Sequence, residues 1–340
     1  MVPFFKGGIM KNKIVCLGEL TLRLSPLDFG RIVQADKFET IFGGAEANVA
    51  VALANLGDEV SYVTKLVENE IGQAALNNIS RFGINTDYIV RGGDRLGIYF
   101  AEKGVGLRSP KVIYDRKNSS IARAKVHEFD WEGIFKDCSI FFVTGITAAI
   151  SEEGKDLVFY SIQEAKKREI EVVFDLNYRS SLWSLDQAAD FYKKILPMVD
   201  ILIGVLPTRH TYFKGEFNHE VLSRMLKDIH EKYGIRYTIS SIRNSYSASK
   251  NSLAAGLYNG REYIKSTTYK FDIVDRIGGG DALAAGLIHS YANGFEIKEA
   301  LDFAVALSAL KHSIIGDYAL FNEKQVGRLV SGDKRMLAFS

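Results

Sequence analysis

The chain has little cysteine and proline and no long hydrophobic run. Of its 340 residues, 5 are proline and 2 are cysteine. Cys16 and Cys138 are too few for a disulfide framework, so we expect small buried side chains in a reducing compartment. No apolar run reaches the ~18 residues that a membrane-spanning helix requires. Met1–Lys13 has no long apolar core followed by a cleavage site, so we expect no signal peptide, a cytoplasmic location and no membrane partner.

The chain also lacks a strong excess of either charge. Lys and Arg total 43 and Asp and Glu total 41, which gives a formal net charge of +2. Nucleic-acid-binding proteins usually carry a marked basic excess, so we expect no nucleic acid partner. The 6 histidines are scattered and lack the spacing of metal ligands. The composition therefore predicts an ordinary soluble globular protein, and no metal cluster is visible in the sequence.

What the chain does contain is a regular alternation of apolar, β-rich runs with helical patterns. This alternation is typical of an α/β protein with a mostly parallel sheet covered by helices on both faces. The expected strands are 13–18, 60–63, 139–143, 171–176, 201–203, 237–241 and 253–258. The expected helices are 43–56, 71–82, 152–168, 221–232, 281–292 and 297–311.

Two stretches, 20–42 and 94–123, interrupt this alternation because they are strand-like and polar, with little helical period. Two such excursions can meet in space as one small β sheet. We expect that sheet to serve as a lid over a site or as a dimer contact. The remaining segments, 13–19, 43–93 and 124–330, then form the α/β core.

The strongest local signal is the run Asp275-Arg276-Ile277-Gly278-Gly279-Gly280-Asp281 ahead of a predicted helix. Glycines allow close approach of the backbone to a ligand, and a helix start directs free N–H groups and partial positive charge toward it. The pattern therefore predicts a phosphate site. Asp281 fits two roles, a helix cap or a general base that accepts the proton of an attacking hydroxyl. No Walker A loop or dinucleotide fingerprint is present.

A glycine pair, Gly43-Gly44, opens the predicted helix at 43–56, and Asn48 lies one turn inside it. One interpretation is helix capping with a buried amide. The other is a polyol site, in which glycine gives clearance and the amide of Asn48 binds hydroxyls.

Polar residues also follow an apolar strand in the run Asp175-Leu176-Asn177-Tyr178-Arg179. Ligands of open α/β sheets bind at the carboxyl ends of the strands, so Asn177 and Arg179 are candidates for phosphate or carboxylate contacts. A polar exit from a strand is the alternative.

In the second excursion, Tyr99, Tyr114 and Arg116 suit a hydroxylated acid, because Arg binds carboxylates with two hydrogen bonds. Exposed strand residues are the alternative.

In this order, the segments resemble the ribokinase-like (PfkB) carbohydrate kinases, which carry a glycine pair ahead of an Asn and a D-x-x-G-x-G-D signature. Here these are Gly43, Gly44 and Asn48, then Asp275, Gly278, Gly280 and Asp281. Four runs look like the 2-keto-3-deoxygluconate kinases of that family: FGGAEANVAVALANLG, EKGVGLRSPKVIYDR, DLNYRSSLW and SALKHSIIGD.

The resemblance implies a Rossmann-type α/β sandwich with a small β lid, and a homo-oligomer formed through that lid. It implies transfer of the γ-phosphoryl group of ATP to the 6-hydroxyl of 2-keto-3-deoxygluconate. Mg²⁺ would be bound through the ATP phosphates, without a metal ligand from the chain, and a monovalent cation is left open.

The resemblance also implies roles for individual residues. Asp281 would be the base, and the N–H groups of Gly278, Gly279 and Gly280 would form the anion hole. The sugar acid would be bound by Gly44, Asn48, Tyr99, Tyr114, Arg116, Arg179 and Asp317. The nucleotide would be bound by Asn177, Arg243, Asp275, Ala309 and His312.

The chain departs from the family at one functional position. The family has an N-x-x-E motif after the strand at 201–203, and its acid helps to place the Mg²⁺ shell. Here Gly204-Val205-Leu206-Pro207-Thr208-Arg209-His210 follows, and the next carboxylate is Glu216. A smaller departure is Ile315, where proline is expected. Two alternatives therefore stand beside the sugar-acid kinase: a kinase of another sugar such as fructose, and a non-catalytic sugar- or nucleotide-binding protein on the same fold.

Overall fold

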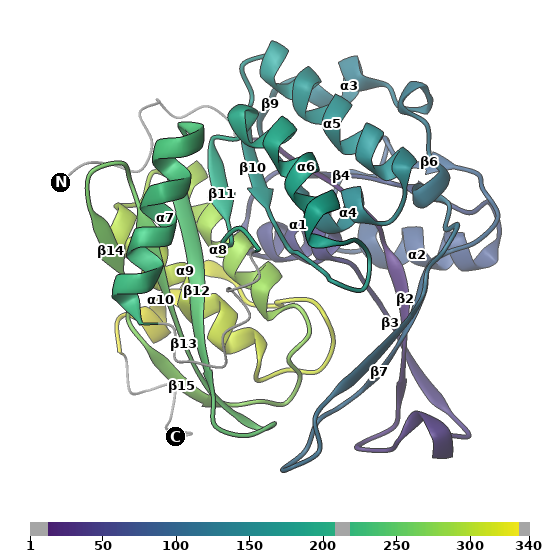
Figure 1. The fold of residues 1–340 in the computed structure, drawn as a ribbon. Coiled ribbons are helices and arrows are strands. Elements are labelled where there is room, and N and C mark those ends of the chain that lie inside the picture. Colours follow the sequence, from purple (N-terminus) through teal and green to yellow (C-terminus); the bar gives the residue numbers. More distant parts are fainter. Residues whose placement is uncertain (1–12, 208–217, 333–340) are drawn as a thin grey trace.

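A computed structural model describes residues 13–207 and 218–332, which are built around one large sheet (Figure 1). Nine strands form it in the order β14-β13-β12-β11-β10-β9-β1-β4, with β15 also paired to β13. Pairs from β4 to β12 are parallel, and β13 is antiparallel to β12, β14 and β15. The strands are β1 (Lys13–Leu17), β4 (Val60–Val63), β9 (Cys138–Thr144), β10 (Glu171–Asp175), β11 (Ile201–Ile203), β12 (Tyr237–Ser245), β13 (Lys250–Tyr258), β14 (Tyr263–Lys265) and β15 (Tyr269–Asp272).

Helices cover both faces of this sheet, and apolar side chains fill the two interfaces. One face packs against α1, α2, α8, α9 and α10, and the other packs against α3 to α7. The central strands are buried on both sides, which explains their continuous apolar runs and confirms the predicted α/β architecture. The helices are α1 (Ala45–Leu56), α2 (Glu70–Ser80), α3 (Trp131–Phe135), α4 (Gly145–Ala149), α5 (Glu152–Lys167), α6 (Leu185–Ile195), α7 (His219–Tyr233), α8 (Gly279–Ala292), α9 (Ile297–Lys311) and α10 (Glu323–Val330).

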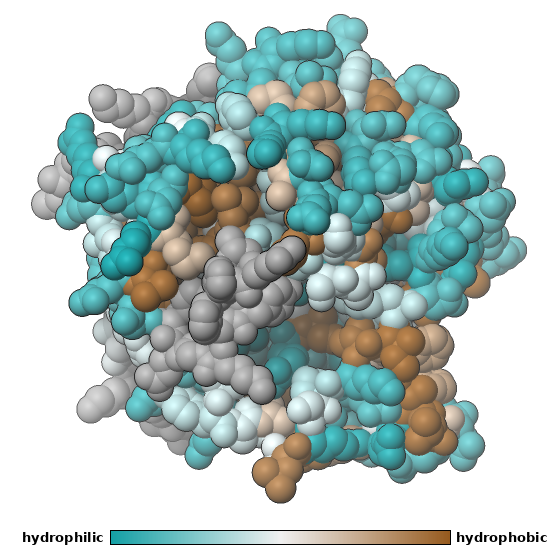
Figure 2. Space-filling view, in the orientation of Figure 1, coloured by the Kyte–Doolittle hydropathy of each residue, from teal (hydrophilic) through white to brown (hydrophobic). Residues whose placement is uncertain are grey.

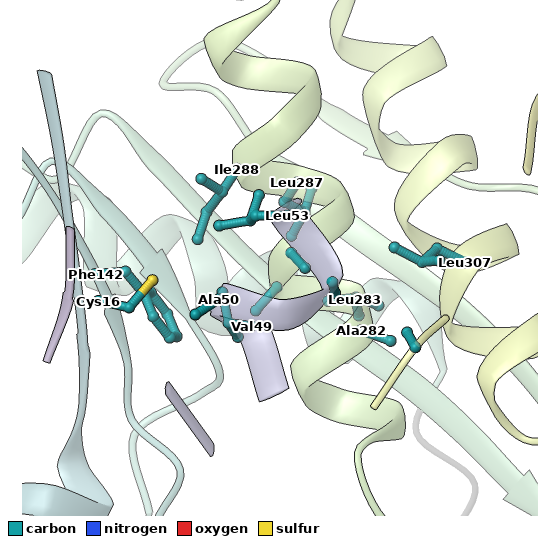
Figure 3. Close-up of a cluster of buried hydrophobic side chains, with 14 of the residues drawn as sticks. Cys16, Val49, Ala50, Leu53, Phe142, Ala282, Leu283, Leu287, Ile288 and Leu307 are labelled. Atoms are coloured by element: carbon teal, nitrogen blue, oxygen red, sulfur yellow. The ribbon is translucent and has the colours of Figure 1, made fainter. Parts of the chain in front are cut away.

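Helix α8 is held in place by the core, and its first turn later forms part of the site. Figure 3 shows α1 packed between the sheet and α8, with side chains such as Leu53 and Leu287 in the interface. A Cβ at Gly286 would lie 2.6 Å from the Cα of Ala304, so α8 and α9 pack at backbone distance. The N-terminus of α8 is therefore fixed from two sides.

A second, four-stranded sheet extends away from the core (Figure 1) in the order β3-β2-β7-β8. It joins two segments distant in the sequence, because β2 pairs with β7 in parallel. All five residues of β8 are exposed. Its strands are β2 (Thr21–Pro26), β3 (Phe38–Gly43), β7 (Ile98–Glu102) and β8 (Lys111–Asp115), and β5 (Lys65–Leu66) pairs separately with β6 (Val90–Arg91).

The sequence pattern predicts the long buried elements and misses shorter ones. Helix α5 begins after Ser151, which caps Gly154 N–H, and it ends in Lys166 and Lys167 as predicted. The pattern does not predict α6, although Ser184 and Gln187 form a capping box there. It also does not predict β14, β15 or α10. Both cysteines are free, with Cys16 buried and Cys138 half-buried.

Candidate active site

A cavity of ≈ 580 Å³ lies where the carboxyl ends of the central strands, the start of α8 and the small sheet meet. Figure 2 shows this face, with hydrophobic side chains gathered over the small sheet beside it. Thirteen predicted site residues line the cavity: Gly44, Asn48, Tyr99, Tyr114, Arg116, Asn177, Arg179, Arg243, Gly278, Gly279, Gly280, Asp281 and Asp317. Thr21 also lines the cavity, so residues from both excursions and from the core meet at one place.

The glycine run before α8 has its conformation for steric reasons that differ between positions. Gly278 is the N-cap and has φ 82°, in the left-handed region. A Cβ at Gly278 would lie 1.9 Å from the carbonyl oxygen of Asp317, and one at Gly279 would lie 2.3 Å from the ring of His312. A Cβ at Gly280 would meet nothing within 4 Å. Close approach of the neighbouring segment therefore requires the first two glycines.

Asp281 lies in the first turn of α8 rather than at its cap, which Gly278 provides. The Asn48 side-chain amide donates from Nδ2 to Asp281 Oδ2 over 2.7 Å. The same amide accepts the Gly44 N–H at Oδ1 over 3.2 Å, which fixes its orientation. Burial raises the pKa of Asp281 to about 7, although the bond from Asn48 opposes the rise. Asp281 is thus a carboxylate that exchanges a proton near neutral pH.

The glycine pair before α1 brings two segments into contact with the site. A Cβ at Gly43 would lie 2.2 Å from Asp317 Oδ2, and one at Gly44 would lie 1.9 Å from the carbonyl oxygen of Glu19. Both positions therefore exclude any side chain. Their close contacts place Asn48 opposite Asp281.

A buried charge network joins the small sheet to the core behind the cavity, and it centres on Arg23 of β2. Arg23 Nη1 lies 2.8 Å from Asp275 Oδ2 and 2.8 Å from Asp317 Oδ1, and its side chain is 1% exposed. Tyr99 of β7 donates its hydroxyl to Asp317 Oδ2. Burial opposes the charge of Arg23, but Asp317 and Asp275 raise its pKa above the ordinary value. Sequence reasoning misses Arg23, because no local pattern marks it.

Arg116, a predicted substrate residue, is paired at the cavity wall. Its Nε donates to Glu19 Oε2 over 2.7 Å, and Nη2 donates to the same oxygen. The guanidinium also lies 5.4 Å from the ring centroid of Tyr114. A Cβ at Gly97 would lie 2.4 Å from Glu19 Oε1, so the strand passes directly over this ion pair. Arg116 is therefore held rigidly at the edge of the cavity.

The end of β10 contributes a carboxylate that the predicted site residues omit. Asp175 lines the cavity, and burial raises its pKa to about 6, with Arg179 opposing the rise. Its Oδ1 accepts the N–H of Asn177 over 2.9 Å. Asn177 itself has φ 34°, which turns the chain sharply after the strand. The sequence could have indicated Asp175 as a site residue, because it is the first residue of the polar run at the carboxyl end of this strand.

Three predicted nucleotide residues lie outside the lining of this cavity. Asp275 is bound to Arg23, as described, and Ala309 is buried. His312 is fully buried, where its Nδ1 pairs with the carbonyl oxygen of Ser308 over 2.6 Å and its ring packs on Phe271. Burial lowers the pKa of His312 to about 4, so the ring is neutral. It supports Gly279 from behind.

Within residues 13–207 and 218–332, no group of three or more His, Cys, Asp or Glu side chains could hold a metal ion. Thr208 to His210 and Glu216, where the sequence departs from the family motif, lie outside the described residues. In the same described ranges, no helix is long and apolar enough to span a membrane.

Comparisons with known proteins agree on one family. A family model described as pfkB family carbohydrate kinase matches residues 11–323. The 2-dehydro-3-deoxygalactonokinase of Haloferax volcanii is 30% identical over 338 residues, which cover 95% of this chain and 98% of that protein. The 2-dehydro-3-deoxygluconokinase of Bacillus subtilis is 26% identical, covering 91% and 92%. The crystal structure of 2-dehydro-3-deoxygluconokinase from Thermotoga maritima has a TM-score of 0.89 and 37% identity, covering 94% of this chain and 100% of that one.

Proposed function

Because the chain belongs to the PfkB family of carbohydrate kinases, we propose that it transfers the γ-phosphoryl group of ATP to a sugar acid, 2-keto-3-deoxygluconate (2-dehydro-3-deoxygluconate), at its 6-hydroxyl. One observation carries this proposal. Asp281, the start of α8 and two arginines, Arg116 and Arg179, all line the same cavity. We place the reaction in the cytoplasm, in keeping with the two free cysteines.

Asp281 acts as the general base in this reaction. A hydroxyl of the sugar acid bound beside Asn48 loses its proton to Asp281 as the oxygen attacks the γ-phosphorus. The pKa of about 7 suits this role, because the carboxylate is ionised in a large share of molecules yet still accepts a proton. The free N–H groups at the start of α8 and the helix dipole stabilise the charge that develops on the transferred group.

The nucleotide occupies the side of the cavity formed by β12 and the loop before α8. Arg243 and Arg276 line that side, together with the hydroxyl residues Ser240 and Ser241. Two guanidinium groups there balance the charge of the triphosphate. Asp275, Ala309 and His312 act from behind, by holding the glycine run in position.

The residues present fit a Mg²⁺ ion that arrives with ATP. Mg²⁺ in kinases is bound through one or two carboxylates, phosphates and water rather than by an all-protein cage. Asp175 is the cavity carboxylate beside the predicted phosphate contacts Asn177 and Arg179. We propose that Asp175 would hold the ion through water molecules bound to the metal. The ion would neutralise phosphate charge. This assignment accounts for activity without the family's N-x-x-E carboxylate.

Arginine placement favours an acid over a neutral sugar such as fructose. Glu19 accepts hydrogen bonds from Nε and Nη2 of Arg116, and the same arginine lines the cavity. Arg179 is exposed and also lines the cavity. A substrate carboxylate between these two groups forms charge-assisted hydrogen bonds, while Tyr99, Tyr114 and Asp317 contact hydroxyls. A neutral sugar would offer no anion to Arg179 and would leave Arg116 paired with Glu19 alone.

The segments 20–42 and 94–123 serve as a lid in this proposal, and the lid also joins two copies of the chain. In β8, Val112 and Tyr114 line the cavity and are 41% and 42% exposed, while Ile113 lies outside that lining and is 41% exposed. Figure 2 shows apolar surface over the small sheet. A second copy that covers β8 would bury this surface and form a symmetric dimer.

The test is ADP release from Mg·ATP with 2-keto-3-deoxygluconate, 2-keto-3-deoxygalactonate, gluconate and fructose, each assayed separately. We expect turnover on the keto-deoxy acids and none with Asp281→Asn. Turnover on fructose alone would support the neutral-sugar kinase. Binding of ATP without turnover on any sugar would support the non-catalytic alternative.

A further inference from the structure

A buried ammonium group lies directly behind the glycine run and takes no part in the reaction proposed above. Lys311, the last residue of α9, has a fully buried side chain. Its Nζ lies 3.5 Å from the carbonyl oxygen of Asp275 and 3.4 Å from that of Ile314. A Cβ at Gly278 would lie 3.3 Å from Lys311 Cε, so the side chain passes against the glycine run. The ammonium group of Lys311 therefore lies directly behind the glycines that we propose as the anion hole.

One face of α9 supports the run as a unit. Ser308 donates its hydroxyl to the carbonyl oxygen of Gly279 over 2.6 Å, and His312 packs against the same residue. Ser308, Lys311 and His312 are three and four residues apart, so they share this face. Ser308 is uncharged and His312 is neutral because of its lowered pKa. Lys311 is thus the charged member of the three.

The acceptors of Lys311 are unusual for a buried lysine. They are main-chain carbonyl oxygens, which are also typical ligands of monovalent cations. Burying an ammonium group without a directly bound carboxylate costs free energy. Burial accordingly lowers the pKa of Lys311, while Asp275 and Asp317 oppose this and Arg23 adds to it. A charge kept at such a cost has a positional role.

That role follows from the geometry of the peptide group. A trans peptide is planar, so a carbonyl that faces Lys311 directs the N–H of the next residue to the opposite side. Lys311 holds the carbonyl of Asp275, which fixes the orientation of the Arg276 N–H. Ser308 holds the carbonyl of Gly279, which fixes the orientation of the Gly280 N–H. The run is kept ready for phosphate before ATP arrives.

We propose that Lys311 is a positioning residue that supplies the glycine run with an internal cation, so that the enzyme needs no monovalent cation from solution. The inference rests on the proposed kinase function. It answers whether this enzyme requires a monovalent cation, which the sequence left open. Ammonium and K⁺ carry the same charge and both bind carbonyl oxygens, so removal of the lysine charge leaves a place that K⁺ or NH₄⁺ can fill.

The experiment measures kcat and the KM for ATP in a tetramethylammonium buffer, alone or with K⁺, NH₄⁺ or Na⁺. For the unchanged enzyme, we expect rates equal within about twofold in all four salts. For Lys311→Met, we expect kcat to fall roughly 10-fold or more, as for a weakened anion hole. K⁺ or NH₄⁺ should restore most of that loss, whereas Na⁺ should restore less.

Two controls accompany this variant. Lys311→Arg keeps the charge, so it should retain more kcat than Lys311→Met and stay indifferent to cations. Lys298→Met removes an exposed lysine from the first turn of the same helix, where it pairs with Asp302, and should match the unchanged enzyme.

Several results would overturn the proposal. If K⁺ raised the kcat of the unchanged enzyme several-fold, the enzyme would lack a sufficient internal cation. This measurement tests the proposal even if Lys311→Met does not fold. A folded Lys311→Met with full kcat would show that the charge is dispensable. If the unchanged enzyme phosphorylates no sugar acid, the kinase proposal fails separately. Calorimetric binding of ATP in the same salts then tests Lys311, with weaker binding rescued by K⁺ expected for Lys311→Met.

Discussion

Two carboxylates at the same cavity, Asp281 and Asp317, are held in opposite ways. Asp317 is fixed by Arg23 and by the hydroxyl of Tyr99, both from the small sheet. Within the part of the chain that the structure describes, Asp281 receives one side-chain hydrogen bond, from the amide of Asn48. Burial raises the pKa of both groups, but at Asp317 a guanidinium opposes the rise, whereas at Asp281 the main opposing group is neutral.

We infer from this difference that Asp317 has a structural role and that Asp281 has a role in proton transfer. Protonation of a carboxylate that is bound to a buried arginine weakens that ion pair, and at Asp317 it would leave the guanidinium of Arg23 paired with Asp275 alone. A carboxylate held by an amide accepts a proton without such a loss. We therefore expect Asp281 variants to change rate and Arg23–Asp317 variants to change stability, and the predictions below test that contrast.

The largest effect on rate should come from Asp281→Asn. Loss of a general base should lower kcat by about 10²–10⁴-fold. The carboxyl of Asp281, half-buried at the cavity, has a pKa of about 7 when folded and about 3.9 when unfolded. Ionisation therefore destabilises the fold increasingly as pH rises between these values, and the variant should unfold at higher urea than the unchanged enzyme above pH 7. A kcat within tenfold of the unchanged enzyme would remove Asp281 from the role of base.

The largest effect on stability should come from Arg23→Met. It leaves Asp275 and Asp317 buried without their cation, which should lower the free energy of unfolding by about 3–5 kcal/mol. Urea unfolding followed by circular dichroism measures this change. The matched control is Arg123→Met, because Arg123 pairs with Glu153 over 3.6 Å at the surface, where a pair contributes about 0–1 kcal/mol. Equal losses in both variants would contradict a structural role specific to Arg23.

A smaller effect on KM, larger for acid than for neutral substrates, is expected for Arg116→Ala, which also leaves the buried carboxylate of Glu19 without its cation and so lowers the stability of the fold. Loss of a charge-assisted hydrogen bond costs about 1.5–3 kcal/mol, so KM for the sugar acid should rise tenfold or more. KM for a neutral sugar should change little. Arg95→Ala serves as the control, since Arg95 pairs with Asp115 of the same small sheet away from the cavity lining. An equal rise for acid and neutral substrates would argue against a carboxylate contact at Arg116.

The smallest effect is a change in pH dependence. For the unchanged enzyme, kcat should fall about tenfold per pH unit below the Asp281 pKa of about 7 and level off above it. Asn48→Ala removes a hydrogen bond that favours the ionised form, so the acidic limb should move to higher pH. The measurement is kcat from pH 5 to 9 at saturating substrate. A limb that stays in place in Asn48→Ala would mean that another group titrates.

Features encoded by contiguous residues could be predicted well. The glycine run and the helix after it are adjacent in the sequence, so Gly278 and Asp281 are recognised without a fold. The strands ending at 144 and 175 are recognised from their apolar runs. Asp281 as a helix cap was the local alternative, and the structure decides against it because Gly278 occupies the cap.

Features that depend on distant partners could not be predicted. Arg23 lies in the ordinary strand TLRLSP, and its acidic partners lie more than 250 residues later. Lys311 resembles the basic residue that often ends a helix, and only its contacts with Asp275 and Ile314 distinguish it. His312, predicted near the nucleotide, lies behind Gly279 because α9 packs against the glycine run.

The sequence by itself determined the α/β architecture and predicted an anion site before α8, because both inferences depend on periodicity and on residues close along the chain. Only the tertiary structure decided which buried charges are paired and which remain able to react. The physical reason is that the protonation of a buried group depends on its desolvation and its nearest charges. For Asp281, Asp317 and Lys311, those neighbours come from elements that meet only when the chain is folded.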